Sequence, residues 1–267
     1  MRKVRIATKT RGTEMKNCFS SILFAAMSLV VLSAAGETAC TRTQAFELVR
    51  GWNAIFLEVQ PGADTPAAVF GGAPVDIVAA YLPPVASVQF IRNPAEEPWN
   101  EPGWAVWYAP SRPESLLSNL QAVRVNRPYL VHATAATTLS VTGRAVAQAV
   151  VWRPNSFNFV GFSLDAAAPP AFGEFFAGSA AHTNARFFRL VDDRWRKVVA
   201  PQTTRMRPGE AYWIYCRGRS THQGPVSVTN TGGVSGIDFG RDGDLAVLHL
   251  ANVGEVPATA HLAQSPE

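Results

Sequence analysis

The sequence predicts a mainly β protein made of two tandem homologous units, each an antiparallel β-sandwich or open barrel with short helical insertions. Two observations lead to this prediction. The chain contains an ordered set of matches between two of its parts, and its apolar residues fall in short runs separated by Pro, Gly and Asn. Runs rich in Val, Phe, Trp, Tyr and Thr are typical of strands. Each unit, at about 90–100 residues, has enough chain to bury its own core.

The matching segments keep the same order in both parts. Gly51-Trp52-Asn53 precedes an apolar run, as Ser156-Phe157-Asn158 does 105 residues later. The later pairs of matching segments are Trp104–Pro110 with Trp195–Pro201, Tyr129–Val131 with Tyr212–Ile214, and Leu139–Thr142 with Val226–Thr229. Chance matches would not keep their order, so we infer a duplication. We place repeat one at residues 44–146 and repeat two at residues 147–236.

The N-terminal segment has the layout of a secretory signal peptide. The apolar stretch Ile22–Leu32 ends at Ser33-Ala34-Ala35, which is a small-residue cleavage site. The stretch is shorter than the ~20 residues of a membrane span, so no transmembrane segment is expected in the mature chain. We therefore expect residues 1–35 to be a removed leader.

Within that leader, Met15 is the better initiator, and residues 1–14 resemble an upstream extension. Residues 36–43 are then a linker into repeat one. Export predicts a secreted protein that is extracellular or on the cell surface, with the periplasm as a further location.

Short helices are expected only as insertions between strands. Thr65-Pro66 begins one such turn, and Pro113-Glu114 begins another that carries Leu116, Leu117 and Leu120. The strand pattern also predicts two hairpins. They are Val88–Ile91 with Trp104–Tyr108, and Phe187–Leu190 with Trp195–Val199 around Asp192-Asp193.

The pattern changes after Gly236. Residues 244–255 alternate and end in an Asn and Gly turn, and Ala258–Leu262 follows as a second strand. Two strands do not bury a core alone. Residues 237–267 are therefore either a tail packed on repeat two or a partial immunoglobulin-like hairpin of a protein that continues beyond Glu267.

Charge excludes a nucleic-acid partner once the leader is removed. Residues 1–35 hold six of the 24 Lys and Arg and one of the 20 Asp and Glu, which leaves 18 basic and 19 acidic residues. The basic isoelectric point of the whole chain therefore comes from the leader. Repeat two keeps ten basic and five acidic residues, whereas residues 237–267 have one basic and five acidic residues.

The arginines of repeat two have two interpretations. They alternate with core residues on the solvent faces of strands, as Arg186, Arg189, Arg194 and Arg196 do around their aromatic neighbours. Alternatively they form a basic patch for an acidic glycan or for the acidic end of a neighbouring surface protein.

Two cysteines remain after the leader, Cys40 and Cys216. In an extracellular protein they can form a disulfide that closes a long loop. Their separation and the absence of a CxxC pattern argue against a zinc site.

Catalytic motifs are absent from the sequence. The five histidines, His132, His182, His222, His249 and His261, lack the spacing that places two ligands on one face, and no nucleophile elbow, metalloprotease, phosphate-loop or dinucleotide motif occurs. We expect no catalytic residue, no metal and no cofactor. A glycosidase can place its two acids at any separation, so a hydrolase remains an alternative.

One loop is a candidate ligand site. The connection between Phe90 and Trp104 is longer than its counterpart in repeat two and contains Trp99, which has no counterpart there. Trp99 with Glu97, Asn100 and Glu101 offers a stacking face and hydrogen-bonding groups suited to a sugar, while prolines stiffen the loop. The alternative is that Trp99 folds back as a lid on the core, as we expect of Trp52, Trp104, Tyr129, Tyr212 and Trp213.

The order of these segments resembles the GWN-type repeat modules of large secreted bacterial surface proteins, and the tail resembles the start of an immunoglobulin-like repeat. Repeat two departs from the pattern, because Ser156 and Phe157 replace Gly and Trp. The resemblance implies an extracellular, non-enzymatic module. Two functions follow: a structural or adhesion module, or a carbohydrate-binding module that uses the Trp99 loop or the arginine-rich face of repeat two, with glycans or neighbouring surface proteins as partners.

Overall fold

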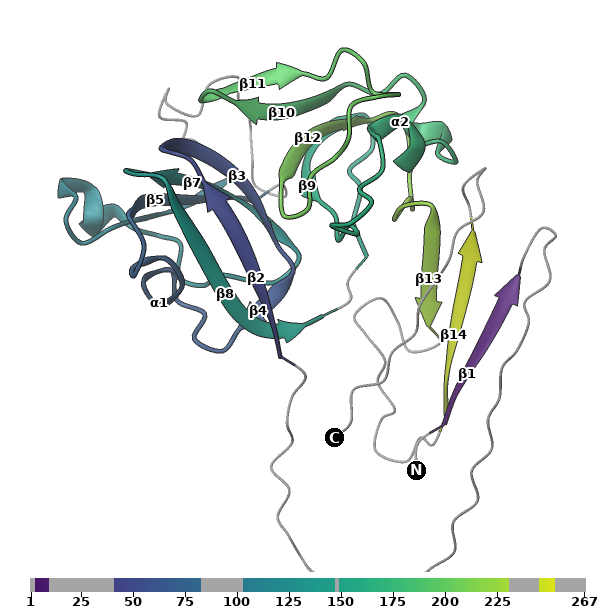
Figure 1. The fold of residues 1–267 in the computed structure, drawn as a ribbon, viewed down its shortest axis with the longest axis horizontal. Helices are drawn as coiled ribbons and strands as arrows, with labels where there is room; N and C mark the ends of the chain where they lie inside the picture. Colours follow the sequence, from purple (N-terminus) through teal and green to yellow (C-terminus); the bar gives the residue numbers. More distant parts are fainter. Residues whose placement is uncertain (1–2, 10–40, 83–102, 147–148, 231–244, 253–267) are drawn as a thin grey trace, which may run out of the picture.

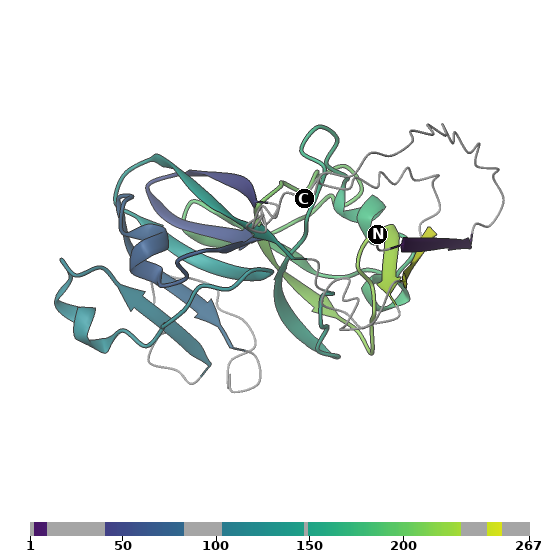
Figure 2. The ribbon, with the colours of Figure 1, turned by 90° about the horizontal axis from the view of Figure 1, so that it is seen from below.

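The computed structural model describes residues 3–9, 41–82, 103–146, 149–230 and 245–252. Their fold is mainly β with a few short helices, as the sequence predicts. Figure 1 shows repeat one and repeat two beside each other, and Figure 2 gives the same arrangement from below.

Repeat one is a sandwich of two antiparallel sheets. Its first sheet has the order β2-β8-β4, from strands Thr41–Leu48, Thr137–Ala145 and Val59–Pro61. Its second, here called the repeat-one sheet, has the order β3-β7-β5-β6, from Gly51–Leu57, Arg127–Ala133, Val75–Tyr81 and Trp104–Tyr108. Alternate residues of both sheets, among them Leu57, Val78 and Val131, are buried in one apolar core between them.

Repeat two contains a sheet of the same design. The repeat-two sheet has the order β9-β12-β10-β11, from Ser156–Gly161, Ala211–Cys216, Phe187–Val191 and Arg194–Lys197. Its strands therefore follow the order of their counterparts in repeat one, and Val160 pairs with Tyr212 as Ile55 pairs with Tyr129. One face covers a core of phenylalanines with the short helices α2 (Phe172–Phe175) and η4 (Ala180–His182).

The matching Asn residues hold equivalent turns. The Asn53 amide accepts from the backbone N–H of Val49 (2.9 Å) and donates to its carbonyl (2.8 Å). Asn158 accepts from Arg153 (2.8 Å) and donates back to its carbonyl (3.1 Å). Both side chains thus pair the backbone groups that a turn leaves without ladder partners.

The matching Tyr residues form equivalent corners. The Tyr129 hydroxyl accepts from the N–H of Arg124 (2.7 Å) and donates to its carbonyl (3.2 Å). Tyr212 makes the same two bonds to Arg207, at 2.7 and 3.2 Å. These tyrosines are structural, and burial raises the pKa of each hydroxyl.

A third apolar cluster joins the two repeats, and the sequence did not predict it. The outer face of the repeat-one sheet packs on the repeat-two sheet through Trp52, Phe56, Tyr81, Trp104, Leu130, Phe159, Trp195 and Trp213. Trp213 is stacked on Phe159 with ring centroids 5.0 Å apart, and Tyr81 meets Trp213 at 4.9 Å. The five aromatic residues expected in the core are therefore buried, three of them between the repeats.

Helical insertions are present where the sequence predicts them, with one difference. Helix α1 (Pro66–Phe70) begins at Thr65, whose hydroxyl accepts from the N–H of Ala68 (3.3 Å). The second insertion, Pro113–Leu117, is the 3-10 helix η3. Leu116 is 94% and Leu117 71% exposed, so only Leu120 of the three leucines is buried.

The two predicted hairpins have different outcomes. In repeat two, β10 pairs with β11 around Asp192 and Asp193, both at positive φ, as in a tight two-residue turn. In repeat one, the partner of β6 is β5 (Val75–Tyr81), a strand that the matches did not include. Val88–Ile91 lies outside the described residues.

The tail begins as a strand that continues the sheet structure. β14 (Leu245–Asn252) pairs antiparallel with β13 (Val226–Asn230), the last strand of repeat two. β1 (Lys3–Lys9) pairs parallel with β14, and β1, β14 and β13 form a separate three-stranded sheet (Figures 1 and 2). The predicted second tail strand, Ala258–Leu262, and the apolar stretch of the leader lie outside the described residues.

Candidate functional site

Trp99, Glu97, Asn100 and Glu101 lie outside the described residues, as does Cys40 of the predicted disulfide. The other cysteine, Cys216, is fully buried, and its thiol donates to the Gly218 carbonyl (3.4 Å). Burial raises the pKa of this thiol.

The four arginines of the predicted basic patch do not all lie on one exposed surface, because Arg189 is largely buried. Its guanidinium forms an ion pair with Glu210 (2.5 Å), and both side chains are only 14% exposed. Glu210 also accepts from the Tyr212 hydroxyl (3.0 Å), and it helps to raise the Tyr212 pKa. Arg189 is therefore a structural residue and not part of an exposed patch.

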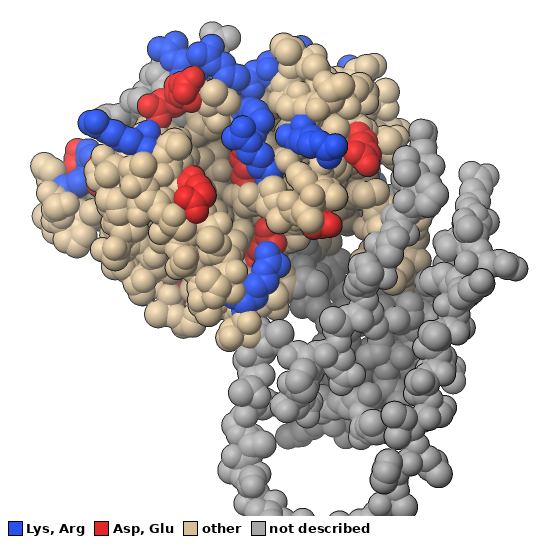
Figure 3. Space-filling view, in the orientation of Figure 1, with Lys and Arg blue, Asp and Glu red and all other residues tan. Residues whose placement is uncertain are grey.

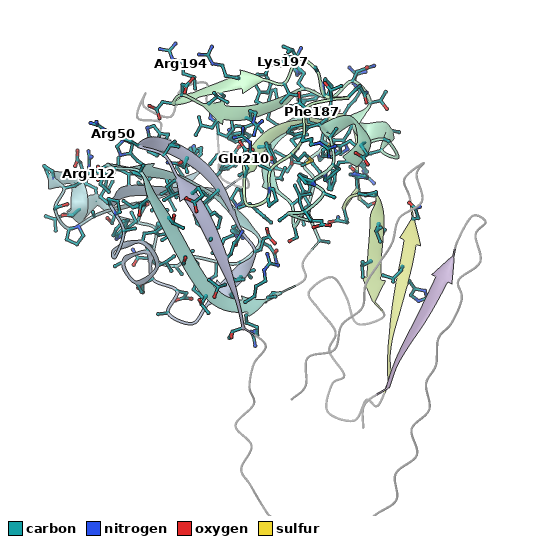
Figure 4. All side chains as sticks on the ribbon, in the orientation of Figure 1. Arg50, Arg112, Phe187, Arg194, Lys197 and Glu210 are labelled. Carbon is teal, nitrogen blue, oxygen red and sulfur yellow. The ribbon has the colours of Figure 1, made fainter. Side chains whose placement is uncertain are left out.

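Two of the other arginines lie on β11. Arg194 and Arg196 are exposed on either side of the buried Trp195, as alternation on a strand requires. Figure 3 shows the basic side chains gathered over the β10–β11 hairpin, and Figure 4 shows Arg194 and Lys197 directed outward. Because β11 is an edge strand, these charges are well placed to prevent pairing with another strand.

The Asp192-Asp193 turn beside these arginines makes a contact between the two repeats. The Asp193 carboxylate accepts from the N–H of Trp52 (2.5 Å), so it joins repeat two to the Gly-Trp-Asn turn of repeat one. Gly51 has φ +98°, and a Cβ there would lie 2.5 Å from Oδ1 of Asp193. The glycine is therefore required by backbone conformation and by close approach.

Arg186 has a different environment from the other three arginines. Its guanidinium carbon lies 4.5 Å from the ring centroid of Tyr215 and 4.9 Å from that of Phe157. The two rings contact each other at 5.2 Å, and Phe157 packs against the buried cluster between the repeats. Arg186 thus lies against two rings packed on the core, while the residue as a whole is exposed to solvent.

Arg186 also lines one of two neighbouring hollows. The first hollow, about 220 Å³, is lined by Ala181, Thr183, Asn184, Ala185, Arg186, Tyr215 and Arg217. The second, about 270 Å³, has a lining that includes Ser179, Ala181, Arg219, Ser220, Thr221, His222 and Gln223. Ala181 belongs to both linings. We call this surface, with its two hollows, the arginine hollows.

The loops that form the arginine hollows are held together by the backbone. The N–H of Arg217 donates to the Ala181 carbonyl (2.9 Å), and the N–H of Gly218 donates to the Asn155 side chain (2.9 Å). The exposed Arg217 and Arg219 are therefore carried on a loop fixed against η4. Sequence reasoning counted both arginines as basic residues of repeat two but did not connect them with Arg186.

The chain segments that line the arginine hollows contain no acidic residue. No Asp or Glu occurs in residues 175–191 or 211–237. Within the part of the chain that the structure describes, Arg186, Arg217 and Arg219 form no ion pair with a carboxylate. Their positive potential is therefore available to an external anion.

A serine and a histidine lie together beneath this surface. Ser179 Oγ is 2.7 Å from Nδ1 of His182, whose Nε2 has no hydrogen-bond partner among the described residues. Burial, with a smaller effect of His222, lowers the His182 pKa to about 4. A histidine of such low basicity, without an orienting carboxylate, is poorly suited to activate a serine.

Repeat one has one further charged cluster. The Asp76 carboxylate lies 2.5 Å from Nδ1 of His132 and accepts from Arg112 (2.8 Å), which also contacts Glu114. Burial alone would raise the Asp76 pKa, but the contacts with His132 and Arg112 outweigh it and lower the pKa. The ring of His132 meets Trp52 at 5.1 Å, the position that Tyr215 holds beside Phe157 in repeat two.

Neither metal nor membrane chemistry is indicated by the described residues. They contain no group of three or more His, Cys, Asp or Glu side chains placed to hold a metal ion. Among their helices, none has the length and apolar character to cross a membrane. Comparison with models of protein families, with curated proteins and with solved structures found no match.

Proposed function

We propose that this chain is an exported, non-catalytic module of the cell surface or secreted space, built for structure and adhesion. The observation that carries the proposal is the aromatic cluster between the repeats. The cluster joins two similar sheets into one body. A structural or adhesion module needs such a body, because its two parts must stay together when it binds a surface. The buried aromatic area of the cluster is a large stabilising contribution, since each such side chain contributes about 1.5–3 kcal/mol.

The polar groups support a non-catalytic role. The charged residues Arg189, Glu210 and Asp193 hold strands and repeats together. The Ser179 and His182 pair lacks the basicity and the third residue that acyl transfer uses. A carbohydrate-binding module is the second candidate, and the arginine hollows are the described surface that favours it.

Export is tested with the full chain in a secreting bacterium. We expect cleavage after Ala35 and recovery of the processed chain outside the cytoplasm, measured by N-terminal sequencing and cell fractionation. The double variant Val30→Arg, Val31→Arg interrupts the apolar stretch and should keep the chain uncleaved inside the cell. The matched control is Arg2→Ala, Lys3→Ala, which lies before Met15 and should leave export unchanged. Cytoplasmic, uncleaved wild-type chain would overturn the proposal.

Adhesion is tested on the processed protein. Beads coated with it should be retained by cells or by extracellular polysaccharide, and beads coated with the urea-unfolded protein should not be. Equal retention of both coatings would show that the folded body has no adhesive role.

A further inference from the structure

We propose that the arginine hollows bind an acidic glycan through the carboxylate groups of successive sugar residues. This inference rests on the proposed function, because it names the ligand of the adhesive surface. It assigns the site to Arg186, Tyr215, Arg217 and Arg219, on repeat two.

The guanidinium of Arg186 is arranged for a carboxylate. The guanidinium carbon of Arg186 lies close to the ring centroids of both Tyr215 and Phe157, so the two rings restrict the positions that the group can take. A planar guanidinium binds a carboxylate through two parallel hydrogen bonds, and a fixed one loses less entropy on binding. Arg217 lines the same hollow, so two guanidinium groups can surround one carboxylate.

The remaining lining suits a sugar. Thr183 and Asn184 in the first hollow, and Ser220, Thr221 and Gln223 in the second, supply hydroxyl and amide groups. These groups donate and accept, as sugar hydroxyls need. The aromatic ring of Tyr215 adds a partly exposed apolar surface.

The size and position of the hollows favour an oligomer of sugars. At about 220 and 270 Å³, each is smaller than the usual site of a drug-sized ligand, which occupies roughly 300–1,000 Å³. Each hollow is therefore suited to a single sugar ring. The two hollows are adjacent, because both are lined by Ala181, and each has its own arginine, Arg217 or Arg219, so the site offers neighbouring places for two linked acidic sugars.

The test measures binding of the purified, processed full chain to a panel of carboxylated polysaccharides by isothermal titration calorimetry. The panel contains polygalacturonate, alginate, hyaluronate and polysialic acid. Polygalacturonate methyl ester is the matched neutral ligand, because it keeps the sugar chain and removes the charge. Heparin tests for sulfate, and polyglutamate tests for an acidic peptide.

We expect at least one carboxylated polymer to bind and the methyl ester to bind at least tenfold more weakly. Arg217→Ala and Arg219→Ala should each weaken binding roughly tenfold to a hundredfold, as loss of a charge-assisted hydrogen bond does. Arg186→Lys keeps the charge but loses the two-bond geometry, and should weaken binding as well. Arg196→Ala removes the same charge from β11 and should change affinity less than twofold.

Several results would overturn the inference. They are failure of all four polymers to bind, equal binding of the methyl ester, tighter binding of heparin or polyglutamate, or equal losses from Arg196→Ala and Arg217→Ala. Thermal unfolding of each variant shows that lost affinity does not come from lost fold. Export and binding are separate measurements, so an exported chain without affinity disproves the ligand alone, and a binding chain that stays inside the cell disproves the location alone.

Discussion

Phe56 and Gly161 occupy the same position in the two repeats, and they lie against each other. Both are the sixth residue of the matching β3 and β9 segments, 105 residues apart. A Cβ at Gly161 would stand 2.2 Å from Cγ of the Phe56 ring. Contact between equivalent positions is what a two-fold interface produces at its axis. Across this contact, a large residue of repeat one is matched by the smallest residue at the equivalent position of repeat two.

Substitution of Gly161 by Ala should therefore destabilise the packing of repeat one on repeat two. The added methyl group meets the inner atoms of the Phe56 side chain, which cannot move as the far end of a flexible chain can. We expect a loss of about 1–3 kcal/mol in the free energy of unfolding, measured by urea denaturation. Gly62→Ala is the control, because a Cβ there meets nothing within 4 Å. Equal stability of the two variants would contradict the described contact.

The two tyrosine corners give a paired prediction. Tyr129→Phe and Tyr212→Phe each remove a hydroxyl that bonds both backbone groups of a residue five positions earlier. We expect each variant to lose about 1–3 kcal/mol of stability, since the Arg124 or Arg207 backbone then lacks its partner. The loss should be larger at Tyr212, whose single hydroxyl proton is shared between the Arg207 carbonyl and the Glu210 carboxylate. Unchanged denaturation midpoints in both variants would disprove the structural role.

Acid should weaken repeat two through His182. Its folded-state pKa of about 4 lies below the 6.5 of an unperturbed histidine, so the unfolded chain binds more protons between those values. The contribution is complete above pH 6.5 and is lost as the pH falls toward 4, by roughly 3 kcal/mol in all. His182→Gln should flatten that part of the curve of unfolding free energy against pH. The exposed His249→Gln is the control and should leave the slope as in the wild type.

The glycine of the Gly-Trp-Asn turn gives a prediction that separates the repeats. Gly51→Ala places a side chain at φ +98° and against Asp193, and should cost about 1–3 kcal/mol. Adding Asp193→Ala to the Gly51→Ala variant should restore only the part of the lost stability that comes from the clash with the Asp193 side chain. At the matching position Ser156, which is not among the positive-φ residues, Ser156→Ala should cost less than Gly51→Ala. Calorimetric melting temperatures of these variants give the comparison, and a more costly Ser156→Ala would contradict it.

The mainly β fold was predictable because strand signals are local. Trp, Tyr, Val and Phe at alternating positions identify a half-buried strand, and Thr65-Pro66 identifies the start of α1. Strand Val75–Tyr81 was missed because five of its seven residues are buried in succession, with Ile77 and Val78 facing different cores, so it shows no alternation. Burial on both faces depends on a neighbouring repeat, which no local pattern reveals.

From the sequence, only the positive charge of the candidate site was predictable, and not the residues that form it. An excess of arginine in repeat two pointed to a basic surface, but Arg189 is paired with Glu210, which lies 21 residues further on. Conversely, Arg186 and Arg217 share a hollow through the contact of two loops. Such partners are set by tertiary structure. The one local signal was the absence of acidic residues from both loops.

The way the two repeats meet limits how many can assemble. Each uses the equivalent face of its sheet, so a joined pair has no such face left for a third. A longer chain of these units would have to grow by whole pairs. An odd unit would expose its aromatic face to solvent, and such an exposed apolar patch promotes aggregation. Any lengthening of this protein in evolution or by design should therefore proceed in even numbers.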